Sequence, residues 1–425
     1  MNRRTFVKRL AGASAGLLVG SRLSPFLGFA QSSDGTPGVT PETITVGMSA
    51  ALTGASAALG VEYYRGAQAY LSEANAAGGV YGRVVQINLK DDAYEPARTL
   101  TNTLEFLDEG VLCLFNYVGT PTLERALPLI KTYDADDLIL LGNLTGAQVQ
   151  REDPYVSQVY NVRPSYYQEM RVLTLGLWGA GVRSFGVFYQ SDSFGRNGVD
   201  GVALALRERD AKIAAEATYR RGASFDTDMT LAAQHLRDAG VEAVLTTGSY
   251  AACGAFIRAA RDIGWEVPVT NVSFVGADAL LALLKEAGAD GRYTRKLVVT
   301  QVVPNLTSTD IVLVQEYRAA MEKYNPALPE GLGGDYTPQL LSFVGLEGYI
   351  NARVLVEGLK LTGLVPDREN FRDTMSNFNT EVGLGVSVNF TGTGNNALHQ
   401  GLNTIYPTLV ENGQWAALTD WAQVL

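Results

Sequence analysis

Segments typical of β-strands and of α-helices alternate along most of this chain, and no other feature constrains its fold as strongly. The first strand-like segment is residues 44–48, and the pattern restarts after Arg163 and Pro164 with a helix and a new strand. Such alternation predicts parallel sheets with helices on both faces. We therefore predict an α/β fold in which residues 43–300 form two consecutive doubly wound, Rossmann-like lobes.

Hydrophobic periodicity gives the expected bounds of these elements. Strands are expected at 44–48, 84–89, 111–116, 138–141, 184–189, 212–218, 242–247 and 267–270. Helices are expected at 63–76, 97–109, 121–132, 166–180, 195–209, 226–239, 251–263, 308–324 and 336–363, with short strand-like segments at 386–390 and 403–410. Ligands of open parallel sheets bind beyond the carboxyl ends of the strands, so the loops that follow strands are where we expect chemistry.

The amino-terminal segment, residues 1–30, has the composition of a cleavable export signal. It begins with basic residues, continues with an apolar run, and places Gly28 and Ala30 before the expected cleavage site. The arginine pair at 3–4 resembles the twin-arginine export signature. Residues 31–42 are expected to be a flexible leader, and no cysteine follows the apolar run to carry a lipid. We expect a mature protein that is free in the periplasm.

Charge and residue usage exclude several function classes. Residues 1–30 carry five basic and no acidic side chains, so the remaining chain is five units more negative than the full −10, at −15. A chain this acidic lacks the basic clusters that bind nucleic acid or anionic lipid. His235 and His399 are its only histidines, and there is no phosphate-binding loop and no cysteine–histidine zinc pattern. We therefore expect no cofactor and no metal.

Paired acids and isolated cysteines have structural interpretations. Asp91 and Asp92 end the second expected strand, and without a third carboxylate we favour helix capping or a loop role over a metal site. Cys113 lies in an apolar strand-like run, and Cys253 is 140 positions further on. Buried free thiols are favoured over a disulfide.

Two polar loops are the strongest candidates for a binding site. Residues 116–122 follow an apolar strand and open a helix, which places backbone N–H groups and the Thr120 hydroxyl at the positive end of the helix dipole. The next strand is followed by a similar loop at 142–145. Either loop alone favours simple helix capping, but together at neighbouring strand ends they favour a small anionic or polar ligand.

Several short motifs, in their order and spacing, resemble the leucine/isoleucine/valine-binding family, which are type I periplasmic solute-binding proteins of ABC importers. The resemblance covers residues 43–425. The motifs lie at 52–54, 76–83, 91–96, 119–122, 185–189, 194–195, 246–250, 257–261 and 273–276.

The resemblance implies the type I periplasmic binding protein fold, with three hinge crossings between two lobes that close on a ligand. Lobe one would comprise 43–162 plus 302–385, and lobe two 163–301 plus 386–425. It further implies a cleft that binds the ligand carboxylate through hydroxyl and backbone N–H groups, an aromatic cover and an apolar lining. The site residues expected on this basis are Tyr117, Gly119, Thr120, Leu144, Thr145, Phe194, Tyr250 and Ser273, with Leu59 as further lining.

Ser273 stands where amino-acid binders of this family carry the acid that pairs with the ligand ammonium. A buried ammonium without a paired carboxylate is expensive to hold. Unless Asp278 or Glu62 supplies the charge, we expect a carboxylate or an amide without an amino group.

The function expected from sequence is therefore a periplasmic receptor that delivers a small carboxylate- or amide-bearing metabolite to an ABC permease in the inner membrane. We expect it to act as a monomer and to catalyse no reaction. Two alternatives stay open: a module that presents the same ligand to a receptor kinase, and a secreted two-domain enzyme, which the scarcity of histidine and the lack of a nucleophile motif disfavour.

Overall fold

The computed structural model describes residues 35–383, 385–393 and 397–425. Residues 36–425 form one compact unit, and the predicted export signal at 1–30 lies outside the described residues. None of the helices in the described ranges is both long and apolar enough to cross a membrane. Cys113 and Cys253 are buried free thiols, as predicted.

Lobe one is built on a parallel five-stranded sheet with the order β2-β1-β3-β4-β5. Its strands are short after the first two. Their bounds are β1 Thr43–Ala50, β2 Val84–Asp91, β3 Leu114–Phe115, β4 Leu140–Leu141 and β5 Val159–Tyr160. The helices between them are α2 Ala57–Ala76, α3 Pro96–Glu109 and α4 Thr120–Thr132. The prediction of a doubly wound unit is confirmed, while the strands expected at 111–116 and 138–141 reduce to two residues each.

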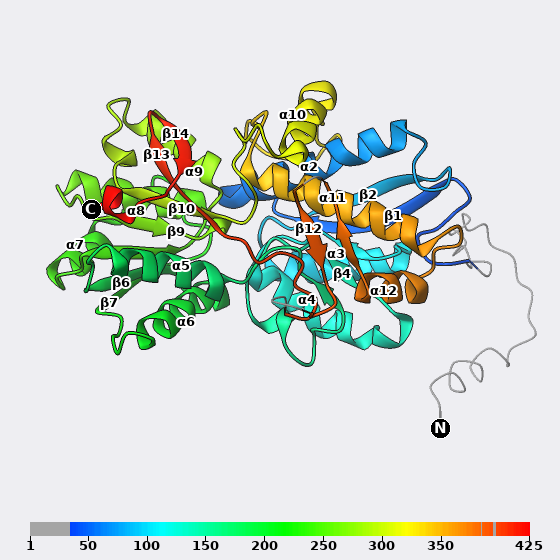
Figure 1. The fold of residues 1–425 in the computed structure, drawn as a ribbon, viewed down its shortest axis with the longest axis horizontal. Coiled ribbons are helices and arrows are strands. Elements are labelled where there is room, and N and C mark those ends of the chain that lie inside the picture. The colour runs from blue at the N-terminus through cyan, green and yellow to red at the C-terminus, as the bar shows by residue number, and fades with distance from the viewer. Residues whose placement is uncertain (1–34, 384, 394–396) are drawn as a thin grey trace, which may run out of the picture. The chain divides into compact units, whose positions relative to one another are not determined.

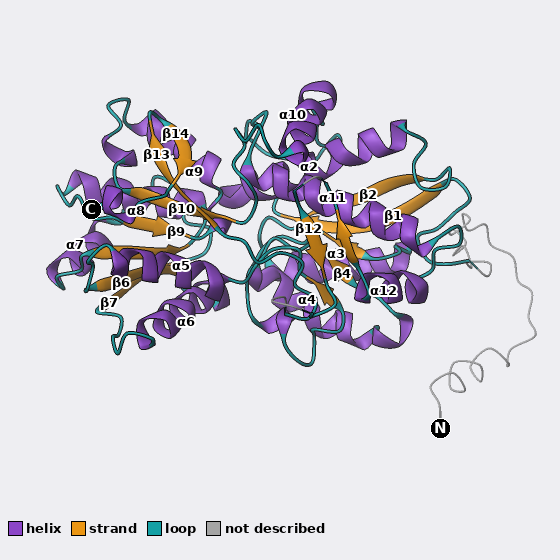
Figure 2. Cartoon of the chain, viewed as in Figure 1, coloured by secondary structure: helices purple, strands orange, loops and turns teal. Residues whose placement is uncertain are grey.

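Lobe two contains a seven-stranded sheet with the order β14-β13-β10-β9-β8-β6-β7 (Figure 1). The five strands from β10 to β7 in this order are parallel, and β13 and β14 add an antiparallel pair at the other edge. The strands are β6 Phe185–Gln190, β7 Ala215–Tyr219, β8 Ala243–Thr247, β9 Val269–Asn271, β10 Leu297–Gln301, β13 Tyr406–Glu411 and β14 Gln414–Ala417. The helices are α5 Tyr166–Gly179, α6 Ser193–Arg207, α7 Thr230–Asp238, α8 Tyr250–Asp262 and α9 Ala277–Ala287, of which α9 was not expected. Figure 2 shows the strands of both sheets enclosed by helices.

The chain passes three times between the two sheets. The first passage follows β5, the second follows β10, and the third precedes β13. The first and third passages run side by side and in the same direction. The Asn161 N–H donates to the His399 carbonyl at 2.8 Å, and the Leu402 N–H donates to the Val162 carbonyl at 2.8 Å. This pairing places two of the three connections in one narrow bundle.

The segment just before the third passage packs against lobe one. A small antiparallel pair joins β11 Asn379–Glu381 to β12 Ser387–Asn389. The Phe390 ring lies 5.5 Å from that of Tyr160 and 5.9 Å from that of Phe378. These contacts favour a lobe boundary near residue 399 in place of the expected 386, and the division of the chain between the lobes stays a prediction.

Three helices complete lobe one: α10 Val312–Tyr324, α11 Phe343–Thr362 and α12 Arg368–Ser376. The prediction of a helix over 336–363 is wrong at its start, because residues 336–342 are not helical. Ser342 caps α11 by accepting a hydrogen bond from the Gly345 N–H at 2.9 Å. Pro338 further restrains its preceding residue from helical backbone angles.

Close backbone approach determines how α2 packs on α11. A Cβ placed on Gly66 would lie 1.8 Å from the Gly345 carbonyl oxygen, and one on Gly348 would lie 2.1 Å from that of Tyr63. Both are far shorter than real Cβ contacts, so the two helices meet through glycine alone at these points.

We predict that Gly66→Ala destabilises the protein by about 2–3 kcal/mol, because the added methyl group forces the α2–α11 backbones apart. The control is Gly179→Ala at the exposed end of α5, where an added Cβ meets nothing within 4 Å. This substitution should be neutral or stabilise by up to about 1 kcal/mol. Urea unfolding measures both variants, and equal effects would contradict the proposed packing.

Candidate functional site

The two polar loops converge as expected. The pairing of β3 with β4 continues as a bridge between Val118 and Leu144. The hydroxyl oxygens of Thr120, the first residue of α4, and Thr145 lie 2.6 Å apart, and both side chains are fully buried. Only one of the two hydroxyl hydrogens can lie between these oxygens. The other hydroxyl hydrogen is not used in the bond between the two threonines. At the amino end of a helix, such a group favours an anionic or polar partner.

Two predicted residues in these loops have other roles in the structure. The Leu144 N–H donates to the Tyr117 carbonyl at 2.8 Å, so it is already committed. The Tyr117 ring packs in a separate apolar cluster of lobe one, where its hydroxyl lies 2.9 Å from that of Thr103. Burial raises the pKa of Tyr117. The structure therefore does not bring the Tyr117 side chain to the other predicted residues.

Aromatic rings from both lobes gather beside the threonine pair. The Phe194 ring lies 4.6 Å from that of Phe274 and 5.3 Å from that of Tyr166, and the Tyr94 ring of lobe one lies 6.0 Å from that of Phe274. All four are buried. Gly119 has φ 100° and packs against Tyr94, because a Cβ there would lie 2.1 Å from the ring. Phe194 and Gly119 were predicted, whereas Tyr94 and Phe274 lie within the recognised motifs without having been selected.

Tyr250 connects the lobes at another point. Its hydroxyl accepts a hydrogen bond from the Ala58 N–H at the start of α2, at 3.3 Å. Leu59 packs next to this contact, since a Cβ on Gly276 would lie 2.9 Å from a Leu59 methyl carbon. Tyr250 and Leu59 thus lie where the two lobes meet, and their expected contact with a ligand stays a prediction.

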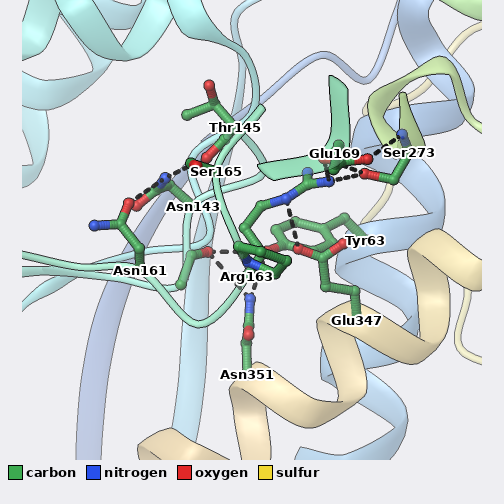
Figure 3. Close-up of polar contacts among 12 residues, drawn as sticks. Tyr63, Asn143, Thr145, Asn161, Arg163, Ser165, Glu169, Ser273, Glu347 and Asn351 are labelled. Atoms are coloured by element: carbon green, nitrogen blue, oxygen red, sulfur yellow. Dashed lines mark hydrogen bonds and ion pairs between the residues drawn. The ribbon is translucent and has the colours of Figure 1, made fainter. Parts of the chain in front are cut away.

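A carboxylate does reach Ser273, but from a helix that was not considered. Glu169 of α5 accepts the Ser273 N–H at 2.7 Å and the Ser273 hydroxyl at 3.1 Å (Figure 3). It also accepts the Thr300 hydroxyl at 2.6 Å. Glu169 is fully buried and already holds several donors, so it is not free to pair with another cation.

Arg163 lies at the centre of this buried network. Its guanidinium is 3.5 Å from a Glu169 oxygen and 3.6 Å from a Glu347 oxygen, and it donates to the Ser273 hydroxyl. Burial alone would lower the pKa of Arg163, but the Glu347 and Glu169 carboxylates raise it above its ordinary value. Burial raises the pKa of Glu347 to about 7, against the opposing effect of Arg163. None of these three charged residues was predicted from the sequence.

A second arginine, the half-buried Arg151, joins the first and third passages between the lobes. Arg151 donates to the Arg163 and Pro164 carbonyls at 3.1 and 3.2 Å and to the Gln400 side chain at 2.7 Å. Gln400 in turn donates to the Gln168 side-chain oxygen at 2.9 Å. Burial lowers the pKa of Arg151 to about 9, which leaves it charged at neutral pH. These bonds hold together two of the passages that connect the lobes.

The two acids considered as substitutes for Ser273 have protein partners. Glu62 pairs with Arg65 at 3.0 Å and accepts the Gln339 N–H at 2.7 Å. Asp278 of α9 accepts the Phe343 N–H at the start of α11, at 2.8 Å, and so links the lobes. Burial raises the pKa of Asp278 to about 7. Both acids line a small cavity of about 10 Å³, room for one water at most.

The acids that end β2 serve the loop, as predicted. Asp92 accepts the Ser49 and Thr99 hydroxyls at 2.7 and 3.0 Å, and Asp91 accepts the Leu52 N–H at 2.9 Å. Burial raises the pKa of Asp92 to about 6. Among the residues with a described placement, no group of histidine, cysteine or acidic side chains has the arrangement of a metal site.

Sequence comparison relates this chain to known binding proteins. The sequence model of one family, described as periplasmic binding protein, matches residues 43–413. An amino acid binding protein of Pseudomonas aeruginosa is 23% identical over 284 residues, 65% of this chain and 72% of its own length. A Leu/Ile/Val-binding protein homolog of Brucella abortus is 24% identical over 245 residues, 56% of this chain and 62% of its own length.

Solved structures agree with this relationship. A possible leucine/isoleucine/valine-binding protein from Rhodopirellula baltica is 32% identical, with a TM-score of 0.76 over 90% of this chain and 98% of its own. A branched chain amino acid ABC transporter protein from Thermus thermophilus with bound valine is 18% identical, with a TM-score of 0.75 over 90% of this chain and 97% of its own, and shares the fold. These are substrate-binding proteins, not enzymes.

We predict that Glu347→Gln weakens the pH dependence of stability. A folded-state pKa near 7 against an ordinary 4.5 means that Glu347 contributes fully below pH 4.5 and that this contribution is lost as pH rises through 7. The free energy of unfolding should fall by up to about 3 kcal/mol over that range in the unmodified protein. Asp92 and Asp278 add slopes of the same sign.

Urea unfolding between pH 5 and 8 measures this slope. The control is Glu357→Gln, a partly exposed position on the same helix, paired with Lys360 at 2.9 Å, which should leave the slope unchanged. An unchanged slope in the Glu347 variant would mean that this carboxyl stays ionised in the folded protein.

Proposed function

This chain belongs to the periplasmic binding protein family, and on that premise we propose that it is the solute-binding component of an ABC importer. It captures a small carboxylate- or amide-bearing metabolite between its two lobes. The ligand-loaded protein then docks on a permease in the inner membrane. The leucine/isoleucine/valine-binding character of its relatives supports the importer assignment.

The observation that carries this proposal is the Thr120–Thr145 hydroxyl pair, buried at the amino end of α4 beneath rings from both lobes. An uncommitted hydroxyl hydrogen at a positive helix end stabilises a carboxylate or an amide oxygen. Phe194 and Phe274 of lobe two exclude water from that point, which strengthens the polar contact.

Ligand capture works by hinge closure. The lobes contact each other through several hydrogen bonds, including Tyr250 with Ala58, Asp278 with the Phe343 N–H, and Asn197 with the Gln148 N–H at 2.9 Å. Lobe one binds the ligand first, and lobe two covers it by bending at the passages that Arg151 joins. A ligand that contacts both lobes stabilises the closed arrangement by its differential affinity for that state.

Export to the periplasm is part of the same proposal. The signal at residues 1–30, with its arginine pair, directs the chain to the twin-arginine route. The family description supports a periplasmic location.

A melting screen over amino acids, simple carboxylates and amides tests the function. A ligand at about 100 times its Kd adds roughly 2.7 kcal/mol of stability and should raise Tm by several degrees. The largest rise should come from a carboxylate or an amide. If no small metabolite of these classes raises Tm, the chain does not bind this kind of solute.

We predict that Thr120→Val weakens binding of the best carboxylate by about 1.5–3 kcal/mol, because it removes a hydrogen bond to a charged group while keeping the side-chain shape. Calorimetric titration measures the change. Thr101→Val, on the exposed face of α3, serves as the control and should bind normally. Equal affinity in the two variants would remove Thr120 from the site.

A further inference from the structure

Arg163 has more hydrogen-bond donors than the protein uses. Its Nη2 group contacts Glu169 and Ser273, but Nε and Nη1 have no hydrogen-bond partner among the described residues. The side chain is fully buried. Leaving charged donors unsatisfied in the interior costs the full desolvation of those groups, so a partner for Nη1 would stabilise the protein considerably.

Tyr166 presents a second unused donor next to the first. Its hydroxyl is fully buried and has no hydrogen-bond partner of good geometry among the described residues. The Arg163 guanidinium lies 5.9 Å from the Tyr166 ring, and the ring of Phe194 lies 5.3 Å from that of Tyr166. The Tyr166 N–H also donates to the Gly146 carbonyl at 2.7 Å, which fixes the residue beside the Thr145 loop. Tyr166 therefore links Arg163 to the Thr145 loop, and Arg163, Tyr166 and the threonine pair form one buried polar cluster.

The charge around this cluster favours an anion. Arg163 and Arg151 interact with the acids Glu169 and Glu347. Glu347 titrates near pH 7, so the four groups carry between no net charge and one positive charge at neutral pH. An added carboxylate compensates the excess, whereas an ammonium group would lie near two guanidinium groups and find no uncommitted carboxylate except Glu347.

We propose that Arg163 Nη1 and the Tyr166 hydroxyl bind the anionic group of the ligand together with Thr120 and Thr145, so that the ligand is a carboxylate without a free amino group. This inference rests on the proposed solute-binding function and narrows its ligand class. Arg163 precedes α5 at the first passage between the lobes, so the ligand's charge is held where the hinge bends.

Matched trios of small molecules test the proposal: 4-methylpentanoate, leucine and 4-methylpentanamide, and likewise 3-phenylpropanoate, phenylalanine and 3-phenylpropanamide. Each trio keeps one carbon skeleton and varies only the charged groups. Calorimetric titration and melting curves are recorded for the unmodified mature protein. In whichever trio binds, the carboxylate should bind at least about 10-fold more tightly than the amino acid of the same skeleton. The reason is that the ammonium group of the amino acid would be buried without a carboxylate to pair with.

Tyr166→Phe is the decisive variant. It removes only a hydroxyl that has no hydrogen-bond partner of good geometry among the described residues, so a purely structural role predicts nearly unchanged stability and unchanged binding. The proposal predicts an unchanged or raised Tm without ligand, together with roughly 10-fold weaker binding of the carboxylate. Tyr293→Phe, whose hydroxyl donates to Asp262 at 2.8 Å in lobe two, is the matched control and should leave binding unaltered.

Arg163→Lys and Arg163→Gln separate charge from shape. Arg163→Lys should keep part of the carboxylate affinity, and Arg163→Gln should lose more of it, while binding of the neutral amide changes less in both variants. The Tyr166 variant remains informative if neither arginine variant folds.

The outcomes distinguish the inference from the function it rests on. Tighter binding of the amino acid than of its matched carboxylate, or full carboxylate affinity in Tyr166→Phe, would overturn the inference and leave the solute-binding function standing. Absence of binding by every member of both trios, and by the wider screen, would overturn both.

Discussion

A buried guanidinium ties the two lobes together. Arg163 lies at the first passage between the sheets and contacts Glu169 on α5, Glu347 on α11 and the loop after β9 that carries Ser273. Glu169 then takes donors from Ser273 and from Thr300 in β10, so one ion pair organises the ends of two neighbouring strands. An unpaired charge in the interior costs much free energy. Each of these elements is therefore held in place, because moving it away would leave Arg163 or Glu169 without a partner.

The hinge and the candidate site share the same backbone. Arg151 binds the carbonyls of Arg163 and Pro164, which are also the residues that connect lobe one to α5. Through Gln400 it reaches the third passage, which runs beside the first. If the ligand binds Arg163, as we propose, its contact acts directly on the segment that connects the lobes, and ligand binding and lobe closure would be coupled through a short, continuous path.

Residues at strand ends could be predicted, and residues on distant helices could not. Thr120, Thr145 and Phe194 follow strands directly, and the carboxyl ends of parallel strands meet at one edge of a sheet, so their neighbourhood follows from local pattern. Tyr117 follows a strand as well, but its side chain faces the α3 side of lobe one, because the face depends on register that the sequence does not display. Glu347 follows Arg163 by 184 positions and meets it only through the packing of α11.

The sequence by itself determined the two-lobed α/β architecture and the convergence of the two polar loops at 116–122 and 142–145, because hydrophobic periodicity and strand-end position are local properties. The resemblance to the family also implied that Ser273 stands where amino-acid binders carry an acid. Only the tertiary structure decided what that replacement means, by bringing Glu169 to Ser273 and surrounding Arg163 with both acids. The charge balance of a buried site is a sum over residues from many elements, and that sum exists only once the chain has folded.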